Sequence, residues 1–72
     1  MKRLYKNINK MIIDGEVFIP GTRVEILVQK VNEAKIMCMY FQKIESIDKA
    51  IYSCDSLTFM NNFILSYPRI DL

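Results

Sequence analysis

The sequence predicts an all-β fold: a small barrel of five or six short antiparallel strands, with room for one short helical turn. Three observations carry this prediction. An Asp-Gly pair separates two runs rich in β-branched residues, residues 23–29 alternate between apolar and polar side chains, and no stretch has the apolar spacing of a long amphipathic helix. A chain of 72 residues has room for a single domain, 1–72, with a small core.

The first hairpin is predicted from Asp14-Gly15, because both central positions of a type I′ turn require positive φ and Asp-Gly favours it. The flanking strands are expected at Ile8–Ile13 and Glu16–Ile19. Residues 1–10 form a basic arm, which carries four of the ten basic residues of the chain and no acidic one. The apolar spacing between Tyr5 and Ile12 also fits one or two helical turns at this end of the chain.

A second hairpin is predicted in the middle of the sequence. Pro20-Gly21-Thr22 breaks the first apolar run, since Pro fixes φ and Gly accepts positive φ. The alternating stretch 23–29 then forms a half-buried strand. The polar residues Lys30–Glu33 are expected to form the loop, and residues 34–41 the partner strand.

The last third of the chain is predicted to return to β structure. Residues 42–49 are charged enough for a surface loop, and the i, i+3 spacing of Ile44 and Ile47 fits one helical turn that brings both to the core. Residues 50–60 are expected to be a strand. The apolar C-terminal tail, residues 61–72, fits either a last short strand or a single helix across one open end, and Tyr67-Pro68 disfavours a helix there.

The layout resembles small bacterial and phage SH3-like β-barrel domains over Ile12–Met60. The resemblance lies in a Gly-Thr-x-Val entry into the central meander, here Gly21, Thr22 and Val24, and in a late leucine, Leu57. It implies that this leucine closes the core. The chain has no Trp and no segment of the "ALYDY" type, so the resemblance does not extend to the peptide groove of eukaryotic SH3 domains.

Six consecutive apolar residues, 36–41, would make a strand that is apolar on both faces. Cross-strand pairing predicts that one face packs in the core. The residues expected there are Val24, Ile26 and Val28 with Ile36, Cys38 and Tyr40.

The opposite face is then expected to carry Leu27, Met37, Met39 and Phe41, an apolar patch that needs a cover. One alternative is internal: the first hairpin, with Ile12, Ile13, Val17 and Phe18, or the tail, with Phe63, Ile64 and Leu65, folds over the patch. The other is that a second chain covers it, and the adaptable side chain of Met suits such a contact.

Catalytic chemistry is not indicated, so we expect a protein that is no enzyme and needs no cofactor or metal. The chain lacks His, which removes Ser-His and Cys-His nucleophile pairs, and its two Gly residues build no phosphate-binding loop. Cys38 and Cys54 are expected to be buried, reduced thiols. No apolar segment reaches the length of a membrane span, and we expect a cytoplasmic protein.

Two binding functions remain. The first is a small protein-interaction module, a regulator or inhibitor of a host protein encoded by a phage or mobile element, as the Ile- and Lys-rich composition suggests. Its contact surface for an unknown partner, or for a homodimer, is Leu27, Met37, Met39 and Phe41. The alternative is a nucleic-acid-binding barrel, in which the arm provides the phosphate contacts and one stacking ring. Its site residues are Lys2, Arg3, Tyr5, Lys6 and Lys10.

Overall fold

The structure, a computed structural model, describes residues 3–66. Within these residues the strands are β1 (Leu4–Asn7), β2 (Met11–Ile13), β3 (Glu16–Phe18), β4 (Arg23–Val31), β5 (Met37–Lys43), β6 (Ile51–Asp55) and β7 (Phe63–Leu65), and α1 (Ser56–Asn62) is the helix. Five strands form one antiparallel sheet in the order β6-β5-β4-β1-β7, and β2 and β3 form a separate pair. The predicted small all-β fold is confirmed.

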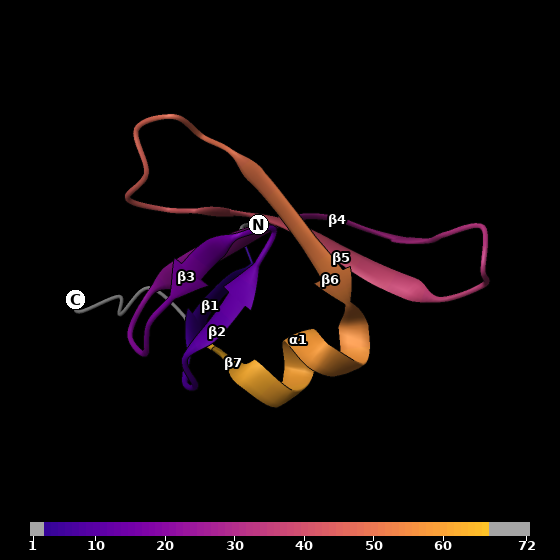
Figure 1. Cartoon of the computed structure of the whole chain (residues 1–72), viewed down its shortest axis with the longest axis horizontal. Helices are drawn as coiled ribbons and strands as arrows, with labels where there is room; N and C mark the ends of the chain where they lie inside the picture. Colours follow the sequence, from indigo (N-terminus) through magenta and orange to yellow (C-terminus); the bar gives the residue numbers. More distant parts are fainter. Residues whose placement is uncertain (1–2, 67–72) are drawn as a thin grey trace.

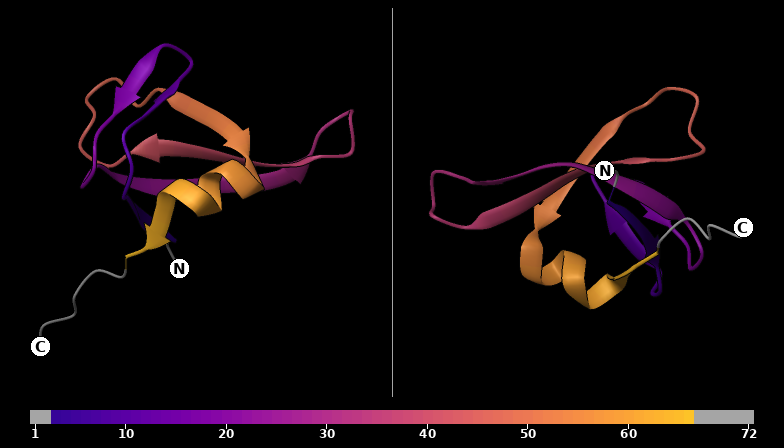
Figure 2. Two further views of the ribbon diagram at one scale, coloured as in Figure 1. Left: turned by 60° about the horizontal axis from the view of Figure 1, so that its bottom comes forward. Right: turned by 180° about the vertical axis from the view of Figure 1, so that it is seen from behind.

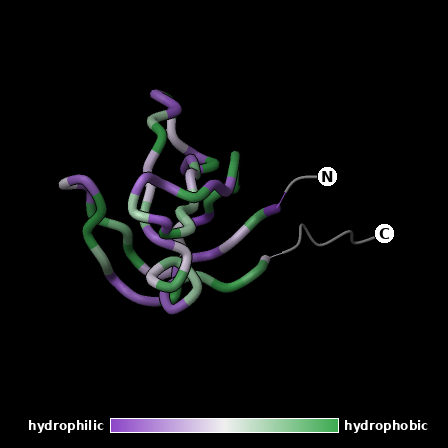
Figure 3. Tube along the Cα trace, turned by 90° about the vertical axis from the view of Figure 1, so that its right-hand side faces the viewer, coloured by the Kyte–Doolittle hydropathy of each residue, from purple (hydrophilic) through white to green (hydrophobic). Residues whose placement is uncertain are grey.

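The core lies between the five-stranded sheet and a second layer made of the β2–β3 hairpin and α1, which cover the same face of the sheet (Figure 1). We call the opposite face of the sheet the outer face. Figure 3 shows short hydrophobic and hydrophilic stretches alternating along the trace, as expected for strands buried on one side. The buried hydrophobic residues are Ile13, Phe18, Val24, Ile26, Met39, Phe41, Tyr52, Phe59 and Phe63.

The first hairpin is confirmed. Asp14 and Gly15 have φ of 53° and 80°, the two positive values that a type I′ turn requires, and Ile13 pairs with Glu16 across the turn. Its first strand is shorter than predicted, since β2 begins at Met11. The helical alternative for the arm is wrong: residues 4–7 form β1, which pairs with both β4 and β7.

A β-bulge in β4 changes which side chains of this strand face the core. The register shifts between Ile26, which pairs with Phe41, and Val28, which pairs with Tyr40. Because the bulge inserts an extra residue, Leu27, the side chains that follow it point to the other face. The core-face prediction is therefore wrong in part: Val24 and Ile26 are buried with Met39 and Phe41, whereas Val28, Ile36, Cys38 and Tyr40 lie outside the core.

The internal cover of the apolar patch is confirmed for its two central residues, Met39 and Phe41, which are fully buried. The ring of Phe41 packs against Phe18 of β3 and Phe63 of β7, with centroids 5.9 Å and 5.6 Å away. Both the first hairpin and the C-terminal region therefore provide the cover.

The β4–β5 hairpin extends beyond the rest of the sheet, as all three ribbon views show (Figures 1 and 2). Its turn lies further along the chain than predicted. β4 continues to Val31, which pairs with Met37, so the turn is formed by residues 32–36 and not by Lys30–Glu33.

The strand predicted over residues 50–60 ends halfway, at Asp55, where α1 begins. The Asp55 carboxylate accepts hydrogen bonds from the backbone N–H of Thr58 at 3.0 Å and from its hydroxyl at 2.6 Å, a helix N-cap. The helix turns Phe59 into the core and leaves Leu57 70% exposed. Leu57 therefore does not close the core, contrary to the implication of the resemblance, and the last strand, β7, follows the helix directly.

The charged segment between β5 and β6 forms a surface loop, as expected, but one of its two isoleucines does not reach the core. Ile44 is half-buried, whereas Ile47 is 98% exposed. The predictions for Tyr67-Pro68 and for the rest of the tail beyond Ser66 lie outside the described residues.

Replacement of Gly15 tests the first turn. Gly15→Val should lower the free energy of unfolding by about 1 kcal/mol or more, because a β-branched residue resists φ near 80°. No atom lies within 4 Å of a Cβ added there, so a loss reports backbone strain and not a clash. Gly15→Asn is the control, since Asn tolerates positive φ. Equal melting curves for the two variants would contradict the turn type.

Substitution of two neighbouring methionines tests the orientation of β5. Met39→Glu buries an unpaired carboxylate and should cost about 3 kcal/mol or more, which lowers the melting temperature by roughly 10 °C or more in a domain of this size. Met37→Glu, on the partly exposed end of the same strand, should change the melting temperature little. The register is wrong if Met37→Glu is the more damaging substitution.

Candidate interaction surface

The part of the β4–β5 hairpin that extends beyond its neighbouring strands, residues 27–37, is here called the projecting hairpin. On one side, β1 pairs only with Arg23–Glu25 of β4; on the other, β6 reaches no further along β5 than Cys38. Five large apolar side chains of the projecting hairpin are 40–52% exposed. They are Leu27, Val28, Val31, Ile36 and Met37.

The tip of the projecting hairpin is organised by Asn32. Its side-chain oxygen accepts hydrogen bonds from the backbone N–H groups of Ala34 at 2.9 Å and Ile36 at 3.0 Å. The backbone N–H of Asn32 donates to the Ile36 carbonyl at 2.9 Å. Lys35 takes positive φ, 66°, to close the turn. These local bonds hold the exposed Ile36 in a defined position next to β5.

Of the four residues predicted to form a partner-binding surface, two are partly exposed in the structure and two are buried. Leu27 and Met37 are partly exposed on the projecting hairpin. Met39 and Phe41 are buried and cannot contact a partner, because the register of β4 with β5 turns them towards α1 and the first hairpin. The exposed apolar surface includes Val28, Val31 and Ile36, which sequence analysis assigned to the core or to a loop.

The residues predicted for nucleic-acid binding do not form one surface. Tyr5 is half-buried and meets Phe59 edge-on at 5.1 Å, so its ring is not free to stack on a base. Arg3 donates a hydrogen bond to the Gln29 side chain at 2.8 Å, and Lys10 lies in the exposed loop before β2. Lys6 is exposed in β1, and Lys2 lies outside the described residues.

Of two further cations that could extend the predicted nucleic-acid site, Arg23 and Lys43, Arg23 lies next to one of its residues, Lys6. Arg23 pairs across the sheet with Lys6, but its guanidinium lies 3.0 Å from the Glu45 carboxylate. The Lys43 ammonium lies 2.9 Å from Glu16 and 4.7 Å above the ring of Phe18. Both cations are therefore largely neutralised by acidic neighbours.

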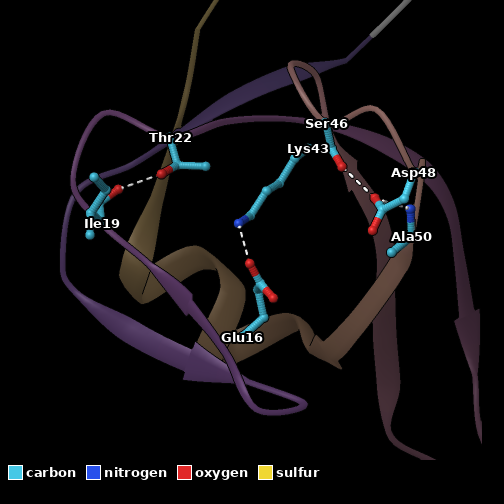
Figure 4. A network of polar contacts seen from close by, with 7 residues as sticks. All are labelled: Glu16, Ile19, Thr22, Lys43, Ser46, Asp48 and Ala50. Atoms are coloured by element: carbon cyan, nitrogen blue, oxygen red, sulfur yellow. Dashed lines mark hydrogen bonds and ion pairs between the residues drawn. The ribbon is translucent and has the colours of Figure 1, made fainter.

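A cleft of about 430 Å³ separates the β2–β3 hairpin from the turn between β5 and β6. Figure 4 shows Lys43 reaching across to Glu16, with Thr22 bonded to the Ile19 carbonyl (2.7 Å) on one side and Ser46 bonded to Asp48 on the other. Sequence analysis missed this cleft because its walls come from segments far apart in the chain. It is lined by Val17, Ile19, Thr22, Arg23, Lys43, Glu45 and Ser46.

The polar groups of the cleft hold its walls together. The Ser46 hydroxyl and the Ala50 N–H hold the pKa of the Asp48 carboxyl below its ordinary value, so this residue is an anion at neutral pH and no general acid. The ammonium of Lys43 and the guanidinium of Arg23 each face a carboxylate. These contacts fix the loops in place, and they align no nucleophile with a base.

The two cysteines are free, as predicted, but they are only half-buried. Cys38 pairs with Asp55, and Met39 pairs with Cys54. Successive residues of a strand point to opposite faces, so Cys54 shares the core face with Met39 and Cys38 lies on the outer face. The two thiols are therefore not placed to form a disulfide. Burial, and after it the negative charge of Asp55, raises the pKa of the Cys54 thiol to about 11.

Comparison with protein-family models, with curated proteins and with solved structures finds no match to this chain. Over residues 3–66 the structure contains no group of three or more side chains placed to hold a metal ion. In the same range no helix has the length and apolar character needed to cross a membrane.

The raised pKa of Cys54 predicts a slow thiol. In a Cys38→Ser variant, alkylation of Cys54 at pH 8 should be about a hundredfold slower in the folded protein than after unfolding, because the thiolate is the reactive form and its fraction falls tenfold per pH unit below the pKa. The measurement is the rate of iodoacetamide labelling followed by mass spectrometry. Equal rates before and after unfolding would show that Cys54 is not shielded.

Proposed function

We propose that this protein is a non-catalytic protein-interaction module that contacts its partner through the projecting hairpin, residues 27–37. Over residues 3–66 no nucleophile is aligned with a base, and the proposal takes binding itself as the function. The role proposed is therefore that of a small regulator or inhibitor of a host protein, encoded by a bacterium, a phage or another mobile element.

The observation that carries this proposal is the composition of the projecting hairpin relative to the core. None of the nine hydrophobic residues that are buried within residues 3–66 lies between positions 27 and 37, so this segment contributes no buried side chain to that core. It nevertheless holds five large apolar side chains in contact with water. Apolar area costs free energy when it is exposed, at roughly 25 cal/mol per Å², and a partner that covers it recovers that energy.

The SH3-like resemblance is part of the proposal. Gly21-Thr22-Arg23-Val24 leads into the antiparallel meander β4–β5–β6, the feature on which the resemblance rests. Gly21 has φ of 97°, and Val24 is buried in the core. These features support a barrel-like domain, although Leu57 does not take the place that the resemblance gives it.

The nucleic-acid alternative has weaker support. Phosphate binding needs unpaired cations on one surface, and here Tyr5 packs inward while Arg23 and Lys43 face carboxylates. The projecting hairpin, by contrast, combines aliphatic side chains with a rigid tip, which suits a protein contact.

Site-specific photocrosslinking in the cells that produce the protein tests the proposal. A photoreactive amino acid at Val31 or Ile36 should yield a discrete adduct with another protein, because both side chains are exposed on the projecting hairpin. Ile47 is the matched control: it is an isoleucine that is even more exposed, on the loop between β5 and β6. Adducts that are equally strong from Ile47, or absent from both hairpin positions, would contradict the proposal.

A further inference from the structure

We propose that the projecting hairpin binds an acidic, extended segment of its partner by strand addition: the segment joins the open edge of β4 at residues 27–31, antiparallel to β4 and in line with β1. This inference rests on the proposed function and specifies the charge and the conformation of the partner segment that binds.

Among residues 3–66, nothing pairs with the edge of β4 beyond the end of β1. β1 pairs with Arg23–Glu25, and the last backbone bond between the two segments runs from the Ile26 N–H to the Arg3 carbonyl at 3.0 Å. Beyond that point, among the described residues, β4 is paired only with β5. The sheet's outer edges are less suitable, because β7 has three residues and β6 lies beside the β2–β3 hairpin.

At two residues of this edge, the backbone N–H and C=O groups point away from β5, to the side on which an added strand would lie. Asn32 donates its N–H to Ile36, within the hairpin. Because backbone groups alternate in direction along an antiparallel strand, Lys30 and Val28 also direct theirs towards β5. Gln29 and Val31 therefore direct their N–H and C=O groups outward, where an added strand can pair with them.

Side chains around the edge favour a segment with acidic residues. A hollow of about 270 Å³ at the end of β1 is lined by Arg3, Leu27 and Gln29 together with Ile26 and Val28. The Arg3 guanidinium holds the Gln29 amide there at 2.8 Å, and its remaining N–H groups suit a carboxylate. On the outer face, the Lys30 ammonium lies 5.1 Å from the centre of the Tyr40 ring, where it can meet a second acidic side chain.

On the core face, which also carries Arg3 and Gln29, the added strand meets apolar side chains nearer the tip of the hairpin. Val31 and Met37 are a cross-strand pair, and both are partly exposed on the face that carries the core. A residue opposite Val31 would pack against both. The segment that fits is therefore apolar where it faces Val31 and acidic at the next two positions: opposite Lys30 on the outer face, and opposite Gln29 on the core face, where Arg3 lies.

A second copy of this chain fits the edge poorly. In an antiparallel pair of two copies that uses these outward groups, Gln29 of each copy pairs with Val31 of the other. This register places the two Lys30 residues directly opposite each other. Like charges in directly opposed positions destabilise a strand pair. Lysine and a bulge are also common devices against uncontrolled edge pairing, so this edge selects an acidic strand and disfavours its own.

The test uses two synthetic peptides of about ten residues, one repeating Val-Glu-Glu and one repeating Val-Lys-Lys, so that an antiparallel segment with valine opposite Val31 has its charged residues opposite Lys30 and Gln29. Titration of the full-length protein, followed by backbone amide NMR shifts, should show binding of the glutamate peptide with the largest shifts at residues 27–31. The lysine peptide should bind at least about tenfold more weakly. Equal binding of the two peptides, or shifts centred elsewhere, would overturn the inference.

Two pairs of variants locate the contact. Gln29→Pro removes an outward N–H, at a position where an edge strand tolerates Pro, together with the Gln29 side chain, and should weaken binding of the glutamate peptide about tenfold. Gln29→Ala removes the same side chain but keeps the N–H, and should not. Arg3→Glu should weaken it similarly, whereas Lys10→Glu, which makes the same charge change in the loop before β2, should not. A folded Gln29→Pro protein with unchanged affinity would overturn strand addition. If Gln29→Pro does not fold, the Arg3 and Lys10 pair decides.

The outcome is separable from that of the proposed function. Adducts from Val31 and Ile36 without binding of the glutamate peptide would refute strand addition and leave the interaction module in place. Absence of both would refute the two proposals together.

Discussion

Burial of Phe41 is the interaction on which the rest of this structure depends. Its ring lies in the core and packs against Phe18 of β3 at 5.9 Å and Phe59 of α1 at 5.1 Å, from the two covering elements, and against Phe63 of the edge strand β7 at 5.6 Å. A domain of this length has too little interior for several independent clusters. Large rings that meet edge-on or tilted therefore join the hairpin and the helix to the sheet, and the edge strand β7 to the central strand β5, at one place.

Features that depend on neighbouring residues were predictable from the sequence. Asp14-Gly15 specifies its turn because few residues other than Gly accept φ near 80°, and Gly21 marks the next reversal for the same reason. The helix was missed, although its N-cap signal was present: Asp55 stands three residues before Thr58, whose N–H and hydroxyl it binds. The β-rich residues on either side of the cap obscured it.

The candidate surface was only partly predictable because it depends on strand register. Alternation of Val24, Ile26 and Val28 indicates one continuous buried face, and nothing in that pattern marks Leu27 as the extra residue of a bulge. A one-residue shift sends every later side chain to the opposite face. Val28 thus becomes exposed, and the same shift leaves Gln29 and Val31 as the residues whose backbone groups point away from β5.

The bulge therefore links the core to the projecting hairpin. Before it, β4 is a central strand, paired on both sides and buried through Val24 and Ile26. After it, the strand has one neighbour among residues 3–66, and its exposed apolar side chains are aliphatic, whereas the aromatic rings named above remain in the core. The core thus holds the base of the hairpin, and Asn32 holds its tip. A hairpin fixed at both ends loses little conformational entropy when it binds, and such preorganisation raises affinity without requiring a larger contact area.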